Sequence, residues 1–206
     1  MTNLYFVRHG KTQFNQAGKI QGAIMDSPLL PQSIADAKKT GKALATVDFA
    51  KVFSSPQKRA LDTGKYIVEQ FKKPVEIETL PALKEFNFGA WDGDLVSEHI
   101  NDKLWQTFKT DPDNFDGSSF GAESYADLTE RVENALAKIV STYPNDNILL
   151  TAHALVITFA VKHLLGKDYR TIREEGLVAN TSITVLETPD FKEFSLVKWN
   201  ETKHLN

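Results

Sequence analysis

The chain has 206 residues, a length that suits one α/β domain. Hydrophobic residues make up 41% and charged residues 25%, as in a globular protein that buries a full core. The net charge of −3 predicts neither a basic surface for nucleic acid nor an acidic tail. The absence of cysteine excludes disulfides, thiolate metal sites and a cysteine nucleophile. No signal peptide or membrane-spanning run is recognisable, so we expect a cytoplasmic protein without membrane contact.

The first predicted strand covers residues 4–7 and is short, apolar and rich in β-forming side chains. It ends in Arg8 and His9, and ligands of open α/β sheets bind at the carboxyl ends of strands. Apolar residues at helical spacing then predict a helix over 31–45. Two polar side chains are therefore expected at a sheet edge where binding sites form.

A second strand is expected within residues 47–54. Ser55 and Pro56 fit the N-cap and first position of a following helix, which extends to Phe71. Arg59 would then lie in the first turn of that helix, beside free backbone amides. This arrangement suits a bound anion.

The middle of the chain is less regular. Alternation predicts a short strand over 75–78, and residues 80–94 have the composition of a structured loop. Trp105 and Phe108 indicate one helix among several loop signals. Residues 86–121 are therefore predicted to form a cap-like insertion over a cleft.

The C-terminal third returns to regular alternation of strands and helices. A buried strand there delivers His153 directly before a helix. This pattern predicts a layered α/β sandwich in one domain, residues 1–206. The expected elements are helices over 128–143 and 154–165 and strands over 148–152, 182–186 and 194–199.

Two histidines and two arginines thus follow strands, or begin a helix that follows one. If those strands are neighbours, the four side chains converge at one edge of the sheet. An arginine offers a planar fork of donors to phosphate oxygens, and a neutral imidazole can attack phosphorus to form a covalent intermediate. The combination favours phosphoryl transfer, although each residue alone would be weak evidence. The four are Arg8, His9, Arg59 and His153.

The motifs that carry these residues resemble those of the histidine phosphatase (phosphoglycerate mutase-like) superfamily, in the family's order and over nearly the whole chain. The matching stretches are Arg8-His9-Gly10-Lys11-Thr12 with Asn15, Gln21-Gly22, Asp26-Ser27-Pro28-Leu29, Ser54-Ser55-Pro56-Gln57-Lys58-Arg59-Ala60, the run 83–93 around Glu85, Ala152-His153, and Asn180-Thr181-Ser182.

The resemblance implies a role for each matching position. His9 would be the nucleophile, and Glu85 would protonate the leaving oxygen and later activate water. Phosphate and substrate would be bound by Arg8, Asn15, Gln21, Gly22, Arg59 and His153. The resemblance also implies a three-layer α/β/α sandwich with a mixed six-stranded sheet, and chemistry without a metal or another cofactor.

The sequence departs from the family pattern at three places. Lys11 occupies a position where an acidic residue is common, and Ala154 follows the second histidine where glycine is usual. The segment 121–124 carries one extra residue, so Glu123 is given no role and is interpreted as part of a helix start.

Phosphatase activity is favoured over mutase activity. In the resembling mutases, cationic residues that bind the substrate carboxylate follow the catalytic Glu. In this sequence the corresponding residues are Phe86, Asn87 and Phe88. The stretch looks most like α-ribazole phosphatase and broad-specificity members, so the expected partner is a small-molecule phosphate ester. The sequence does not determine which ester is used, or the oligomeric state.

Aromatic side chains gather after Glu85. We expect at least half of them to be core and the rest to wall the pocket. The aromatic residues are Phe86, Phe88, Trp91, Trp105 and Phe108. Enclosure by Phe86, Phe88 and Trp91 should raise the pKa of Glu85 and give a mildly acidic to neutral optimum.

Three alternatives stay open. One is a phosphoglycerate mutase-type phosphotransferase. Another is a metal-dependent aspartyl phosphatase, suggested by Asp92 and Asp94, although that pair does not follow a buried strand. A third is a regulatory protein that binds phosphate without catalysis, whose expected mark is loss of the nucleophile or the acid. Both His9 and Glu85 are present.

Overall fold

The computed structural model describes residues 1–206. Its six strands are β1 (Thr2–Arg8), β2 (Phe49–Ser54), β3 (Ile77–Thr79), β4 (Asn147–Ala152), β5 (Ile183–Thr188) and β6 (Ser195–Glu201). Its α-helices are α1 (Gln13–Ala17), α2 (Pro31–Leu44), α3 (Lys58–Val68), α4 (Val96–His99), α5 (Lys103–Thr110), α6 (Tyr125–Thr142) and α7 (Ala154–Leu164). Short 3₁₀ turns are η1 (Pro81–Leu83), η2 (Gly89–Trp91), η3 (Pro112–Asn114), η4 (Ser118–Phe120) and η5 (Lys203–Leu205).

The strands form one mixed sheet in the order β3-β2-β4-β1-β5-β6. The pairs β3–β2, β2–β4 and β4–β1 are parallel, whereas β1–β5 and β5–β6 are antiparallel. Because β1, β2 and β4 are parallel neighbours, their carboxyl ends meet at one edge, with Arg8 beside Ala152 and Ser54 beside Thr151. This topology confirms the expected mixed six-stranded sheet and the convergence at its edge.

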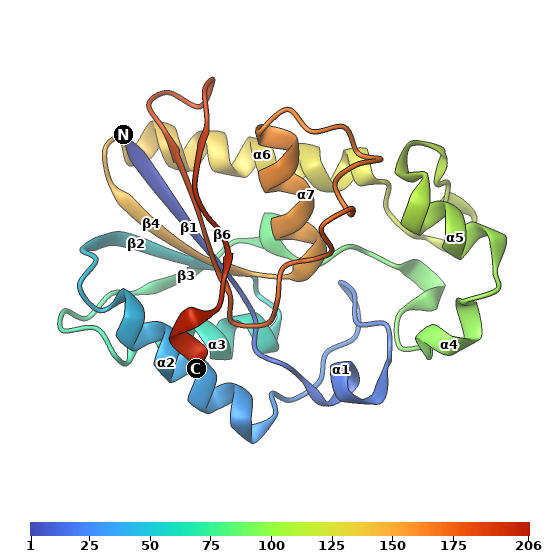
Figure 1. Ribbon diagram of the computed structural model, residues 1–206, viewed down its shortest axis with the longest axis horizontal. Helices are drawn as coiled ribbons and strands as arrows, with labels where there is room; N and C mark the ends of the chain where they lie inside the picture. Colours follow the sequence, from blue (N-terminus) through green and yellow to red (C-terminus); the bar gives the residue numbers. More distant parts are fainter.

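Helices cover both faces of the sheet, α6 and α7 on one and α2 and α3 on the other (Figure 1). Alternate residues of β1 supply the two cores, since Leu4 and Phe6 belong to the cluster with α6 and α7 and Val7 to the cluster with α2 and α3. The three-layer α/β/α sandwich is therefore confirmed. No helix of the structure has both the length and the apolar composition needed to span a membrane.

Local signals explain most helix starts. Proline opens α2 at Pro31, where a missing N–H costs nothing. Ser124 caps α6 through a reciprocal pair of bonds with Asp127, which confirms the expected helix start after Glu123. The expectation for α3 was wrong by two residues, because Gln57 is its N-cap and Ser55 and Pro56 precede it. The Ser55 hydroxyl accepts the Gln57 N–H and also bonds His153 on a neighbouring strand end.

The segment 86–121 contains α4, α5 and three 3₁₀ turns and lies to one side of the sheet (Figure 1). Its aromatic side chains are packed together and join the larger core cluster beside α6. All five aromatic residues singled out in the sequence are buried, with 0–8% of each exposed: Phe86, Phe88, Trp91, Trp105 and Phe108. The expectation that at least half of them are core is confirmed.

Candidate active site

A cavity of about 150 Å³ opens at the carboxyl ends of β1 and β4. Five of the eight site residues predicted from the sequence line it, and they are Arg8, His9, Asn15, Gln21 and Glu85. Ala154 also lines the cavity, so the methyl group that replaces the family's usual glycine does face the site. Lys11 is exposed and does not line it.

His9 follows β1 and is 3% exposed. Its Nδ1 lies 2.8 Å from the carbonyl oxygen of Gly10. A carbonyl only accepts, so Nδ1 must carry the proton and Nε2 keeps its lone pair. Burial, and then the charges of Arg59 and Arg8, lower the pKa of His9 well below its usual value. The ring is therefore held neutral, in the tautomer that a nucleophile at Nε2 requires.

His153, the second histidine of the site, has its Nε2 bonded and its Nδ1 without a protein partner. It is fully buried at the end of β4, and its ring centroid lies 5.2 Å from that of His9. Its Nε2 lies 2.8 Å from the Ser55 hydroxyl, while Nδ1 has no partner in the protein. Burial and the charge of Arg59 lower the pKa of His153 as well. If the Ser55 hydroxyl donates to Nε2, the proton of the neutral ring sits on Nδ1, as a donor.

Arg59 lies in the first turn of α3 and is 1% exposed. Its two Nη groups donate to four acceptors in the loop 21–26: the carbonyls of residues 21, 22 and 25 and the carboxylate of Asp26. Only Nε is left without a protein partner. The fork that the sequence assigned to phosphate is thus occupied by the loop. Arg59 contributes its charge and one N–H.

Arg8 has more donors available. Its Nη1 donates to the Val178 carbonyl at 2.7 Å, and its buried Nε is unpartnered. Burial lowers the pKa of Arg8 to about 10, so the guanidinium remains charged at neutral pH. Of the two arginines, Arg8 alone lines the cavity, and it is the better placed to bind a phosphoryl oxygen directly.

Glu85 is 5% exposed and reaches the N-terminus of α7. Its carboxylate accepts the N–H groups of Phe86, Leu155 and Val156 at 2.9–3.4 Å. Those bonds and the nearby arginines favour the charged form, but burial is the largest effect and raises the pKa of Glu85 above its usual value. The direction matches the sequence-based expectation for a group that must hold a proton.

Three predicted binding residues are used within the protein. The side-chain amide oxygen of Asn15 accepts the Thr12 N–H in a capping box, which leaves the side-chain N–H groups of Asn15 free. The Gln21 amide bonds Thr12, Ser27 and Asp26. Gly22 does not line the cavity, and its N–H donates to an aspartate while its carbonyl accepts from Gln57 and Arg59.

Gly22→Ala tests how tightly this loop is packed. A Cβ at Gly22 would lie 2.5 Å from the Phe86 carbonyl oxygen, directly after Glu85. We expect the substitution to lower the free energy of unfolding by about 1–3 kcal/mol and to reduce kcat/KM, because the backbone beside Glu85 must shift. Gly166→Ala, in open space with a φ of +75°, is the control and should cost stability alone. Full kcat/KM in Gly22→Ala would contradict this account.

Sequence reasoning missed the residues that hold these groups in place. Gln57 donates to the Gly22 carbonyl and accepts the Glu85 N–H, and Thr63 accepts the Gly10 N–H while its hydroxyl donates to the Arg59 carbonyl. Gln57 lies within the recognised motif around Arg59, which was a usable signal. Thr63 carried none, because its role depends on Gly10, which follows β1, lying beside α3.

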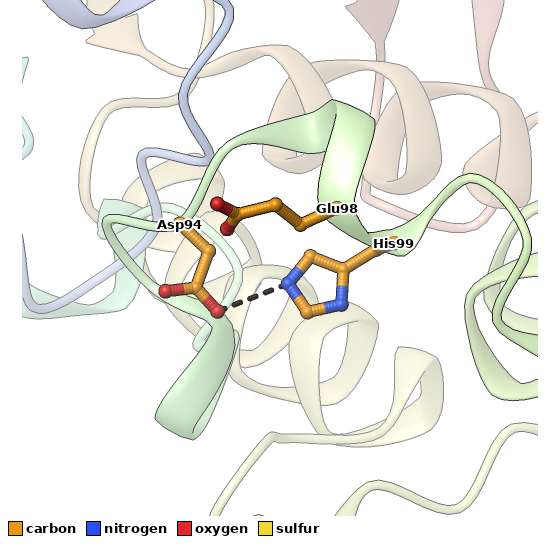
Figure 2. Close-up of side chains that lie close together, drawn as sticks. All are labelled: Asp94, Glu98 and His99. Carbon is orange, nitrogen blue, oxygen red and sulfur yellow. Dashed lines mark hydrogen bonds and ion pairs between the residues drawn. The ribbon is translucent and has the colours of Figure 1, made fainter.

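The aspartates of the metal-dependent alternative have other partners. Asp92 follows η2 and accepts backbone N–H groups of Gly22, Ile24 and Met25. Asp94 accepts from His99 Nε2 at 2.9 Å, with Glu98 beside the pair (Figure 2). The ligand atoms of Asp94, Glu98 and His99 lie within 4.8 Å of one another and could hold a metal, but none of the three lines the cavity with His9.

The family model of the histidine phosphatase superfamily (branch 1) matches residues 4–202. The chain belongs to this superfamily. An uncharacterized phosphatase PhoE of Bacillus subtilis is 31% identical, with 100% of this chain and 98% of that protein covered. A metal-independent phosphoserine phosphatase of Arabidopsis thaliana is 28% identical over 100% of this chain and 84% of that protein. These matches confirm the predicted family, and they confirm that this histidine phosphatase is an enzyme of the phosphatase class.

Solved structures agree with the fold. The Entamoeba histolytica phosphoserine phosphatase, solved with 3-phosphoglyceric acid, superposes with a TM-score of 0.85 at 28% identity, and all of both chains is covered. Bacillus stearothermophilus YhfR gives a TM-score of 0.92 over both complete chains at 24% identity, a likeness of fold.

Proposed function

We propose that this histidine phosphatase hydrolyses small-molecule phosphate monoesters through a phosphohistidine on His9. The observation that carries the proposal is the buried, neutral His9 with its lone pair on Nε2, in one cavity with Arg8 and Glu85. Phosphoryl transfer depends mainly on positioning and on stabilising charge. Arg8 and Arg59 supply that charge from the protein itself.

In the first half-reaction, His9 Nε2 attacks phosphorus and a P–N bond forms. The bond from phosphorus to the ester oxygen breaks, and Glu85 donates its proton to that oxygen, which leaves as the alcohol. Arg8, Arg59 and His153 stabilise the transferred group, with Nδ1 of His153 as a donor. In the second half-reaction, Glu85 takes a proton from water, the water oxygen attacks phosphorus, and the P–N bond breaks, so that inorganic phosphate leaves and neutral His9 is restored.

The segment 86–121 is proposed to be the cap over this site. Phe88, Val96 and Trp105 come from it and line the cavity. Phe108 stacks on Tyr125 of α6 with ring centroids 5.3 Å apart, so the cap is packed into the body of the domain. A wall built in this way positions a substrate without a large closing movement.

The mechanism is tested by a labelling experiment with ³²P-labelled phenyl phosphate in the presence of EDTA. We expect turnover to be unchanged by the chelator and a quench in alkali to retain label on the protein, because phosphohistidine is stable in alkali and labile in acid. Turnover that is lost in EDTA and restored by Mg²⁺ would favour the metal-dependent alternative. The absence of alkali-stable label during active turnover would contradict the covalent intermediate.

A mutase is the alternative function that would use the same phosphohistidine intermediate. It would return the phosphoryl group to a phosphoglycerate, whereas the proposed enzyme gives it to water. Release of inorganic phosphate from 3-phosphoglycerate, without formation of the 2-isomer, separates the two. We further propose that the enzyme works in the cytoplasm on free metabolites, without a nucleic-acid or membrane partner, which the weak net charge supports.

A further inference from the structure

Six of the twelve residues that line the cavity have large apolar side chains. They are Ile20, Phe88, Val96, Trp105, Leu155 and Leu177. They come from the loop after α1, from the cap, from α7 and from the segment between α7 and β5. Separate parts of the chain therefore converge to make one apolar wall. Such walls with a few polar groups are typical of sites for small ligands.

Positive charge in the cavity lining is confined to one side chain. Arg8 is the only lysine or arginine that lines the cavity, and it borders His9. The Nη groups of Arg59 are used by the loop 21–26. With Arg8 engaged by the phosphoryl group, a carboxylate on the alcohol would share the cavity with apolar side chains, the carboxyl group of Glu85 and the amides of Asn15 and Gln21, without a cation of its own. Leaving a charge unpaired there is unfavourable.

The apolar wall is held in place partly by Arg8, the same residue that is proposed to bind the phosphoryl group. Arg8 donates to the carbonyl of Val178, directly after Leu177, and the Val178 N–H donates to Thr158 of α7. Arg173, earlier in the same segment, lies over the Phe108 ring at 4.6 Å. Leu177 is 36% exposed at the rim, so it can bury further surface against a substrate.

From this geometry we propose that the enzyme selects phosphate esters of small, uncharged, apolar alcohols, branched aliphatic or aromatic, over esters that carry a carboxylate near the phosphate. Leu177 and Val96 are the specificity-determining residues at the rim. The inference rests on the proposed function of the same site. It also separates this chain from the relatives whose names specify phosphoserine as the substrate.

Three alkyl phosphates with similar leaving groups make the test. We expect kcat/KM for 2-methylpropyl phosphate to exceed that for 3-phosphoglycerate and O-phosphoserine by at least about 10-fold, the discrimination that a single apolar contact provides. Leu177→Lys should shift the ratio about 10-fold toward 3-phosphoglycerate. Leu177→Met is the matched control and should keep the wild-type preference. Equal or higher kcat/KM for the carboxylates, or an unchanged ratio in Leu177→Lys, would overturn the inference.

Failure of this inference can be distinguished from failure of the proposed function by p-nitrophenyl phosphate. If the protein hydrolyses it with alkali-stable labelling but prefers the carboxylate esters, the selectivity is refuted and the phosphohistidine mechanism stands. If no ester is hydrolysed and no label forms, the proposed function itself fails. A thermal melt of each Leu177 variant shows whether the folded protein was compared.

Discussion

His9→Ala is expected to lower kcat for p-nitrophenyl phosphate by at least about 10⁴-fold and to abolish the alkali-stable label. The reason is that His9 Nε2 is the proposed point of covalent attachment, and the other groups of the cavity only bind or transfer protons. Arg8, Arg59 and His153 would still bind phosphate, so KM or the affinity for inorganic phosphate should change far less than kcat. Steady-state kinetics and a ³²P quench measure the two effects.

A matched control removes a histidine outside the cavity. His163, on the last turn of α7, pairs with Glu133 and does not line the site. His163→Ala should keep both turnover and label. Because His9 is buried against Gly10, circular dichroism and a thermal melt must show that His9→Ala is folded. Full activity in a folded His9→Ala protein would eliminate the mechanism.

Glu85→Gln is expected to have an effect that depends on the leaving group. For an alkyl phosphate, whose alkoxide must be protonated as it departs, kcat should fall about 10²–10⁴-fold. For p-nitrophenyl phosphate the loss in the first step should be much smaller, since p-nitrophenolate is a stable anion. A pre-steady-state burst with that substrate would then show slow hydrolysis of the phosphoenzyme, because Glu85 also activates water.

The pH profile gives a second readout for Glu85. Burial raises its pKa, and the group must be protonated in the first step, so the rate with an alkyl phosphate should fall as pH rises through that raised pKa. On the acidic side, the lowered pKa of His9 keeps its ring neutral below about pH 6.5. The optimum should therefore be mildly acidic to neutral.

Glu85→Gln should lose the alkaline limb of this profile, whereas Glu98→Gln, an exposed carboxyl outside the cavity, should keep it. The two proteins must be compared by thermal melting, since Glu85 accepts three backbone N–H groups that an amide satisfies only in part. A wild-type rate that still rises above about pH 9 would contradict the role of Glu85 as the acid.

The sequence by itself determined the order of elements, the family and the candidate catalytic pair. Residues 4–7 and 148–152 could be predicted as buried strands because their apolar runs are short and continuous. The histidines after those strands then defined the edge where ligands bind. Such signals are local in the sequence, so they can be recognised without knowledge of the packing.

Only the tertiary structure decided how each side chain is used. The helix after β2 begins at Lys58, and Ser55 before it bonds His153, a contact between residues nearly a hundred positions apart. Gly22 proved to be a packing position beside the Phe86 carbonyl. Such contacts depend on which strands are neighbours, and no local pattern encodes that.

His9 and Arg59 show the same difference between what the sequence identifies and what the folded structure decides. The sequence identified both, but the Nδ1 bond to Gly10 that leaves Nε2 free, and the loop that occupies the Arg59 fork, follow from the folded backbone around them. The lowered pKa of His9 likewise arises from burial and from charges brought close by the sheet. The sequence determined which chemical groups are present, and packing determined their protonation, their free donors and the apolar wall that faces the substrate.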